Sequence, residues 1–180
     1  MTQSKTLRRW ELALLLGVAL AALLGVWLDG AQAALSDRVI RLHVLANSDS
    51  EADQALKLRV RDAVLAEAEE LFVPGAGRAE TEELLRAHLY DLAAAGAEVV
   101  GEAGYSYPVT ASLVHDYWFP PKTYTDFALP AGAYTALRIE IGAGGGQNWW
   151  CVVFPPLCLG SVSETTQETA LEAGLTENQV

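Results

Sequence analysis

Cysteine, histidine and basic residues are all scarce in this sequence of 180 residues. It contains 2 cysteines, 3 histidines and 12 lysines and arginines, against 23 aspartates and glutamates. Two cysteines and three scattered histidines do not give the ligand spacing of a zinc site. The formal net charge is −11, so the protein as a whole repels anions. Binding of nucleic acid or anionic lipid through the net charge of the protein is therefore excluded.

Sequence motifs of catalytic sites are also missing. The chain has no Gly-x-Ser-x-Gly elbow, and neither His43 nor His115 is spaced to activate Ser48 or Cys151 as a nucleophile. Residues 47–53 alternate like the opening of a calcium loop. However, Ala52 and Leu58 stand where that loop needs glycine and glutamate. We therefore predict a protein that is not an enzyme and that binds no metal or cofactor.

One long apolar run is present, at the N-terminus. Lys5, Arg8 and Arg9 precede the apolar residues 12–28, and Ala31-Gln32-Ala33 offers a site for signal peptidase. The run is also close to the roughly 20 residues that span a bilayer. Residues 1–33 are therefore predicted to be a signal peptide or an uncleaved membrane anchor. The positive N-terminal flank places the rest of the chain outside the cytoplasm in both cases.

The remaining chain is predicted to form one exported domain, residues 34–160, followed by a disordered acidic tail, residues 161–180. Residues 38–49 alternate as a strand, with His43 on a more polar face that is expected at the surface or edge. A Ser-x-x-acid capping pattern then opens a helix up to Phe72, and a second helix carries three glutamates in its first turn.

Three further strands are predicted at residues 109–119, 133–142 and 149–154. The last is a continuous apolar run, which is typical of a central strand covered on both faces. The order β-α-α-β-β-β predicts the α+β class, with an antiparallel sheet of about four strands and two helices packed on one face.

The segment 142–158, GAGGGQNWWCVVFPPLC, concentrates glycine, tryptophan and cysteine. Because a strand and not a helix follows the glycines, we predict a mobile hairpin loop instead of a phosphate site. Neighbouring strand residues point to opposite faces, so either Trp149 or Trp150 is predicted in the core and the other at the surface. The alternative places both in a two-sided core. After export, Cys151 and Cys158 are the candidates for a disulfide, and two buried free thiols are the alternative.

Two stretches of the sequence resemble one protein family. They are LANSDSEADQALKLRVRDAV, which begins at Leu45, and PAGAYTALRIEIGAGGGQNWWCVVFPPLC, which begins at Pro130. Together with the N-terminal export signal, they are similar to stage II sporulation protein R of endospore-forming bacteria, over roughly residues 38–160.

The resemblance implies an intercellular signal and not a catalyst. Members of the family are made in the forespore and exported into the space between forespore and mother cell. There they trigger a membrane-embedded aspartic protease of the mother cell, which removes the pro-sequence of sigma-E. This chain would meet the membrane only through its N-terminal segment, if that segment stays uncleaved.

A partner surface is expected where the glycine-tryptophan segment and the start of the first helix lie. The residues predicted to form it are Asn47, Asp49, Asp53, Asn148, Trp149 and Trp150. Exposed aromatic side chains beside a glycine-rich loop are typical binding hot spots. The alternative function is a secreted cell-wall glycan-binding module, in which an exposed tryptophan stacks on sugar.

Overall fold

The structure is a computed structural model that describes residues 9–124 and 127–157. The chain divides into two compact units, residues 1–34 and 35–180. This division falls one residue after the boundary expected at Ala33. The predicted tail, residues 161–180, lies outside the described residues.

The N-terminal unit is built on one helix, α1 (Arg9–Ser36), which is rich in the strong helix formers alanine and leucine. Its segment Arg9–Trp27, of 19 residues, is long and apolar enough to cross a membrane. Elsewhere in the described ranges, no helix meets this criterion. An apolar N-terminal helix of this kind fits a signal peptide or a membrane anchor and is compatible with export.

Four strands form the main sheet, in the order β2-β5-β1-β6. They are β1 (Ile40–Leu45), β2 (Val109–Phe119), β5 (Gly132–Ile141) and β6 (Asn148–Phe154). Two neighbouring pairs, β1 with β6 and β2 with β5, are antiparallel, whereas β1 and β5 are parallel. The predicted α+β class with about four strands is confirmed. The sheet is mixed and not purely antiparallel, because the helical connection after β1 is long enough for a crossover.

Three helices connect β1 to β2: α2 (Glu51–Glu70), α3 (Arg78–Ala87) and α4 (Leu89–Glu102). Ser50 caps α2, since its hydroxyl accepts a hydrogen bond from the backbone N–H of Asp53 at 3.1 Å. The single second helix of the prediction is two helices, broken at His88, where φ is −108° and ψ is 19°. Leu85 before the break and Leu92 after it are both fully buried, so each helix keeps its apolar stripe in the core.

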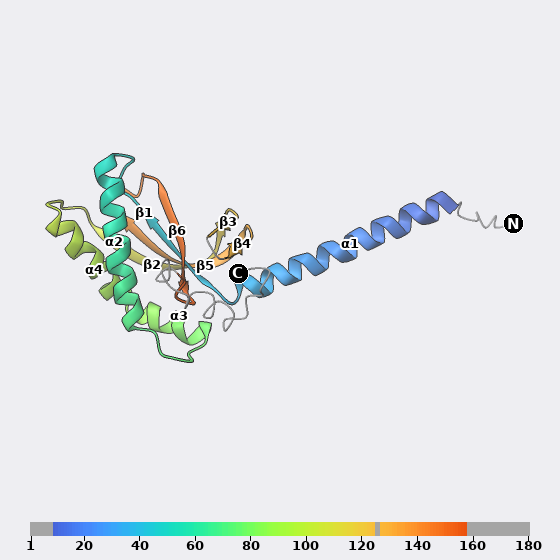
Figure 1. Cartoon of the computed structure of the whole chain (residues 1–180), viewed down its shortest axis with the longest axis horizontal. Helices are drawn as coiled ribbons and strands as arrows, with labels where there is room; N and C mark the ends of the chain where they lie inside the picture. The colour runs from blue at the N-terminus through green and yellow to red at the C-terminus, as the bar shows by residue number, and fades with distance from the viewer. Residues whose placement is uncertain (1–8, 125–126, 158–180) are drawn as a thin grey trace. The chain divides into compact units, whose positions relative to one another are not determined.

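One face of the main sheet is packed against α2 and α4, as Figure 1 shows. Gly96 lets α4 approach closely, because a Cβ atom there would lie 3.0 Å from Val109 Cγ1 and 3.1 Å from Val60 Cγ1. Alternate strand residues supply the sheet side of this core. The fully buried members of this first cluster include Ile40, Leu42, Val44, Leu137 and Ile139 from the strands and Val60, Val64 and Leu92 from the helices.

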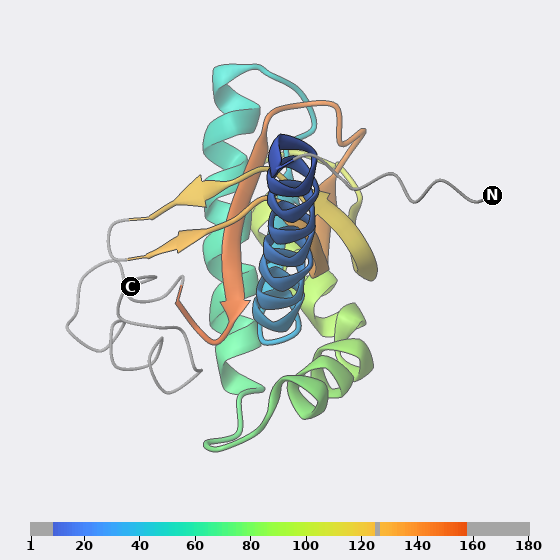
Figure 2. The ribbon, with the colours of Figure 1, turned by 90° about the vertical axis from the view of Figure 1, so that its right-hand side faces the viewer.

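The opposite face of the sheet is covered as well, which the sequence predicted for the strand 149–154 alone. A short ribbon of β3 (Lys122–Thr123) and β4 (Ala128–Leu129) lies on this side in Figures 1 and 2. Together with aromatic residues of β2 and β5 it builds a second cluster: Leu35, Val39, Phe119, Phe127, Leu129, Tyr134, Ala136, Val152 and Leu157. The expected surface position of His43 is therefore wrong, since both His43 and Arg41 are 0% exposed.

β6 lies at the edge of the sheet, and the central position predicted for it belongs to β1 and β5. Its continuous apolar run has a different cause. Because both faces of the sheet are covered, the two sides of β6 each meet a hydrophobic cluster: Val153 belongs to the first and Val152 to the second. A continuous apolar run therefore indicates that both faces of a strand are covered, but it does not show whether the strand lies at the centre or at the edge of the sheet.

Candidate functional site

Two of the predicted partner residues, Asn47 and Asp53, meet where β1 ends and α2 begins. The Asp53 carboxylate accepts hydrogen bonds from Ser48 Oγ at 2.5 Å and from Asn47 Nδ2 at 2.9 Å. These bonds, that of Ser48 first, hold the pKa of Asp53 below its usual value. Asp53 is 4% exposed. Its carboxylate therefore organises the loop and is not presented to a partner.

The glycine run is packed directly on this cluster. Asn47 Oδ1 accepts a hydrogen bond from the backbone N–H of Ala143 at 3.0 Å. A Cβ atom on Gly142 would lie 2.2 Å from Asn47 Oδ1, and one on Gly146 would lie 2.2 Å from the carbonyl oxygen of Ser48. Gly142 also has a φ of +59°, which favours glycine. The glycines are thus required for close packing, and the predicted mobile hairpin loop is a packed loop.

Lys57 ties α2 to the same loop. Its Nζ donates to the carbonyl oxygen of Gln147 at 2.9 Å and to Gln54 Oε1 at 2.6 Å. Gln54 in turn donates from Nε2 to the carbonyl oxygen of Ser48 at 2.8 Å. Burial lowers the pKa of Lys57, and the nearby charge of Asp49 opposes that shift. The start of α2, the segment after β1 and the glycine loop therefore form one interlocked unit at this end of the sheet.

The two tryptophans lie on opposite sides of β6, as the alternation of strand residues predicts. Trp149 faces the helices, and the guanidinium carbon of Arg61 stands 4.5 Å from the centroid of a Trp149 ring. Trp149 remains 37% exposed. Trp150 is paired with His43 in the register of β1 and β6 and packs on the second cluster. Trp149 is therefore the tryptophan that a partner could contact.

The structure separates the six predicted partner residues into two groups. Asp49, Asn148 and Trp149 lie at the surface, although Asn148 Oδ1 also bonds His43 Nε2 at 2.7 Å. The other three, Asn47, Asp53 and Trp150, make internal contacts that hold the loops and the second cluster together. Partner binding by any of the six stays a prediction.

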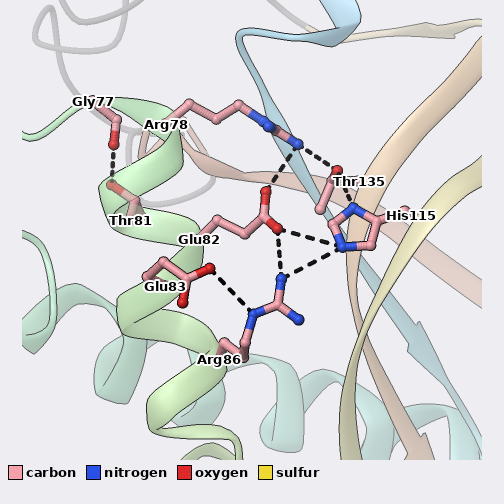
Figure 3. Close-up of polar contacts among 8 residues, drawn as sticks. All are labelled: Gly77, Arg78, Thr81, Glu82, Glu83, Arg86, His115 and Thr135. Atoms are coloured by element: carbon pink, nitrogen blue, oxygen red, sulfur yellow. Dashed lines mark hydrogen bonds and ion pairs between the residues drawn. The ribbon is translucent and has the colours of Figure 1, made fainter.

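A second polar cluster, which the sequence did not single out, joins α3 to the sheet (Figure 3). The Glu82 carboxylate lies 2.7 Å from Arg86 Nη2, 3.1 Å from Arg78 Nη2 and 3.4 Å from His115 Nε2. Arg78 also donates to the hydroxyl of Thr135. The spacing of four residues between Arg78, Glu82 and Arg86 was the available signal. His115 had none, because it reaches the cluster from a β-bulge between Val114 and Tyr117.

The series Glu82, His115 and Thr135 has the residue types of an acid–base–nucleophile triad. His115 Nδ1 lies 3.3 Å from Thr135 Oγ1, on the side of the ring opposite Glu82. However, Thr135 is buried, its hydroxyl already accepts from Arg78, and two arginines share the charge of Glu82. A working triad needs an accessible nucleophile and an acid devoted to the histidine. We interpret the cluster as a clamp that holds α3 on β2 and β5.

Potential metal ligands do not gather in the part of the chain that the structure describes: no group of three His, Cys, Asp or Glu side chains could hold an ion there. Cys151 is half-buried on β6. Cys158 lies outside the described residues, so a disulfide between the two stays a prediction.

Comparison with known proteins places these features in one family. Residues 36–164 match the sequence model of the stage II sporulation protein R family. The chain belongs to that family. The resemblance of the two sequence stretches is thereby confirmed, and the match includes the whole main sheet, the helices α2–α4 and both polar clusters.

The stage II sporulation protein R family also contains a curated relative from Bacillus subtilis (strain 168), itself named stage II sporulation protein R. It is 39% identical over 124 residues, which are 69% of this chain and 55% of that protein. The chain thus spans about half the length of the relative that it matches. No solved structure matches the chain.

The region shared with the stage II sporulation protein R family begins at Ser36, which is the last residue of α1. The apolar segment Arg9–Trp27 therefore precedes the part of the chain that defines the family. Family membership and the apolar helix are two separate observations, and both agree with a sporulation signalling protein that is exported.

Proposed function

We propose that this protein is an exported sporulation signal that activates a membrane-embedded aspartic protease of the mother cell, so that pro-sigma-E is processed. The observation that carries the proposal is the family match over residues 36–164, directly after an apolar helix suited to export. Family membership supports the signalling role, and the proposal adds its target. The compartment we propose is the space between the forespore and mother-cell membranes.

The proposed contact surface lies at the end of the sheet where Trp149 is exposed. Asn148 precedes Trp149 in β6, and Asp49 follows β1, the strand that pairs with β6; both residues lie at the surface. The Arg61 guanidinium covers one side of the indole. An aromatic and an arginine in contact are the residue types that dominate binding energies at protein interfaces. The packed glycine loop and the Asp53 cluster hold this surface in one conformation, which reduces the entropy that binding costs.

The experiment is co-expression of the exported chain with a sporulation aspartic protease and pro-sigma-E, with cleavage as the readout. Residues 34–160, delivered outside the membrane, are expected to suffice. Loss of cleavage on truncation at Gly160, with the protein still folded and abundant, would show that the tail belongs to the active unit.

Two exposed tryptophans allow a matched test of the contact surface. We expect Trp149→Ala to weaken binding by roughly 2 kcal/mol, or about 30-fold, and to reduce cleavage accordingly. Trp118→Ala is the control, since Trp118 is 66% exposed at the far end of β2. Equal cleavage losses in both variants would remove Trp149 from the proposed surface.

One observation favours the alternative of a glycan-binding module. Trp118 presents most of its surface to solvent, as a sugar-stacking platform requires. Pull-down with purified peptidoglycan discriminates the two functions. The signalling proposal predicts no retention, whereas retention that Trp118→Ala abolishes would favour the glycan-binding module.

A further inference from the structure

Arg41 is a fully buried cation on the covered side of the sheet opposite the helices. Its guanidinium carbon lies 4.1 Å from the centroid of Phe119 and 5.1 Å from that of Tyr134. Its Nη2 makes one long hydrogen bond, of 3.3 Å, to the hydroxyl of Tyr124. Two aromatic faces and one neutral hydroxyl therefore surround a charge that arginine cannot lose by deprotonation.

Several donors in this region have no acceptor. Arg41 Nε and Nη1 are buried without a hydrogen-bond partner, and so is Trp150 Nε1. Both side chains lie on the same face of neighbouring strands, because Arg41 pairs with Val152 and Trp150 pairs with His43 in the register of β1 and β6. Residues in such a diagonal arrangement are within reach of one another when the side chains are long.

Tyr124 connects the two donor residues. Its hydroxyl accepts from Arg41 Nη2 and donates to the carbonyl oxygen of Trp150 at 3.4 Å. The hydroxyl thus occupies only one of the Arg41 nitrogens. Tyr124 directly follows the β3–β4 ribbon's first strand, and that ribbon is paired at two residue positions only. A two-stranded ribbon of this size is marginally stable by itself, so its place on the sheet depends on Phe127 and Leu129, which are buried in the second cluster.

Among the described residues of this face, the charges of Arg41 and Arg138 exceed that of Glu140, in a chain whose net charge is strongly negative. Arg138 is paired with His43 in the register of β5 and β1, and its guanidinium is neutralised by Glu140 at 3.0 Å. Among the ion pairs between described residues, none involves Arg41. A buried charge without a counter-ion is strongly unfavourable. The unpartnered N–H groups of Arg41 and Trp150 define where a counter-ion would be bound.

We propose that Arg41 and Trp150 form a binding site for a carboxylate group, carried by a glutamate or aspartate side chain of a peptide segment. A carboxylate has two acceptor oxygens, one for a free N–H of the Arg41 guanidinium, at Nε or Nη1, and one for the indole N–H of Trp150. Arg41 lies outside the sequence motifs of the predicted partner surface, and the site is not an exposed basic patch of the kind that binds phosphate. It is independent of the Trp149 surface in the proposed function.

The test is a nuclear magnetic resonance titration of the full chain in a non-ionic detergent. The signals followed are the Trp150 indole N–H, assigned with Trp150→Phe, and the Arg41 Nε–H, assigned with Arg41→Met. The probes are N-acetylglutamate α-amide and its uncharged match N-acetylglutamine α-amide, with acetate and chloride as further arms. The glutamate compound is expected to shift both signals in a saturable way, while the glutamine compound and chloride shift neither.

Two variants confirm the donors. Trp150→Phe is expected to weaken binding of the glutamate compound roughly 10-fold, followed at Arg41, and Arg41→Met to weaken it by more than that. If Arg41→Met does not fold, Trp150→Phe still decides the matter. The proposal is overturned by an absence of saturable shifts, by equal shifts with the glutamine compound, or by saturable shifts with acetate that the glutamate compound does not produce.

Discussion

The two faces of the main sheet are both buried, yet they are built from different chemistry. On the face toward the helices, β1 presents Ile40, Leu42 and Val44, all fully buried among aliphatic side chains. On the other face the same strand presents Arg41 and His43, which are equally buried but lie among aromatic rings. One strand of six residues thus contributes to an apolar core and to a polar one.

The difference indicates which face carries the stability of the fold. Aliphatic side chains gain free energy from burial alone. Arginine, histidine and the tryptophan N–H lose hydration and need partners that the second face supplies only in part. We infer that the first face contributes more to the stability of the domain, whereas the unpartnered donors of the second face belong to the proposed carboxylate site.

The largest effect is expected from the helix-covered face. Leu42→Ala should lower the free energy of unfolding by about 2–5 kcal/mol, because it leaves a cavity in the first cluster. Denaturant unfolding followed by circular dichroism measures this. Leu58→Ala on the exposed side of α2 is the matched control, with a change within about 0.5 kcal/mol. Equal losses in both variants would remove the distinction between core and surface on α2 and β1.

The next effect tests whether the glycine loop is packed or mobile. Gly146→Ala should cost about 1–3 kcal/mol, since its Cβ would lie 2.2 Å from the backbone oxygen of Ser48. Gly145→Ala should be tolerated, because its nearest contact, the Asn47 carbonyl oxygen, is at 3.5 Å. Thermal unfolding of the two variants gives the comparison. If both melt like the wild type, the loop is not packed as described.

His43 provides a pH test of the second face. Burial lowers the pKa of His43 below its ordinary value of about 6.5. Below that pH the unfolded chain takes up a proton that the folded protein resists. The stability present at pH 7 should therefore fall as the pH is lowered through 6 and 5, by at most about 1.4 kcal/mol per pH unit.

His43→Gln should flatten this slope, because it removes the buried imidazole. Unfolding free energies at several pH values provide the measurement. A His43→Gln variant with the full wild-type slope would mean that other groups cause the pH dependence.

The sequence predicted the strands better than it predicted their surroundings. Alternation located β1 and β5 and placed Trp149 and Trp150 on opposite faces, because the period of a strand is a local property. It could not show that Arg41 and His43 are covered, since the cover comes from residues some 80 positions later in the chain. Tyr124, Phe127 and Leu129, between the predicted strands 109–119 and 133–142, were the available signal, because a solvated connection rarely holds so many large apolar residues.

The candidate site was predicted with the same limits. The capping pattern fits both Ser48 with Glu51 and Ser50 with Asp53. It could not show that Asn47 and the glycine loop close over the Asp53 carboxylate. That arrangement depends on the contact of two loops that are distant in sequence. Likewise, His115 enters the Glu82 cluster only through a bulge in β2.

The smallest expected effect distinguishes two arginines on α2. Arg61→Ala should cost about 0.5–1 kcal/mol through loss of its contact with Trp149. Arg59 forms only an exposed pair with Glu102 at 3.7 Å, so Arg59→Ala should cost less than about 0.5 kcal/mol. Denaturant unfolding of both variants gives the values, and a larger loss for Arg59→Ala would reverse the interpretation of the Trp149 surface.

The stability of Arg41→Met tests the central claim most directly, because methionine keeps an apolar stem in the second cluster and removes the charged guanidinium with its one hydrogen bond to Tyr124. The measurement is thermal unfolding in a buffer free of carboxylates. We predict a Tm equal to or above that of the wild type, since an uncompensated buried charge is lost. A Tm as low as that of Leu42→Ala would contradict the account, because Arg41 would then stabilise the fold in the same way as the first face.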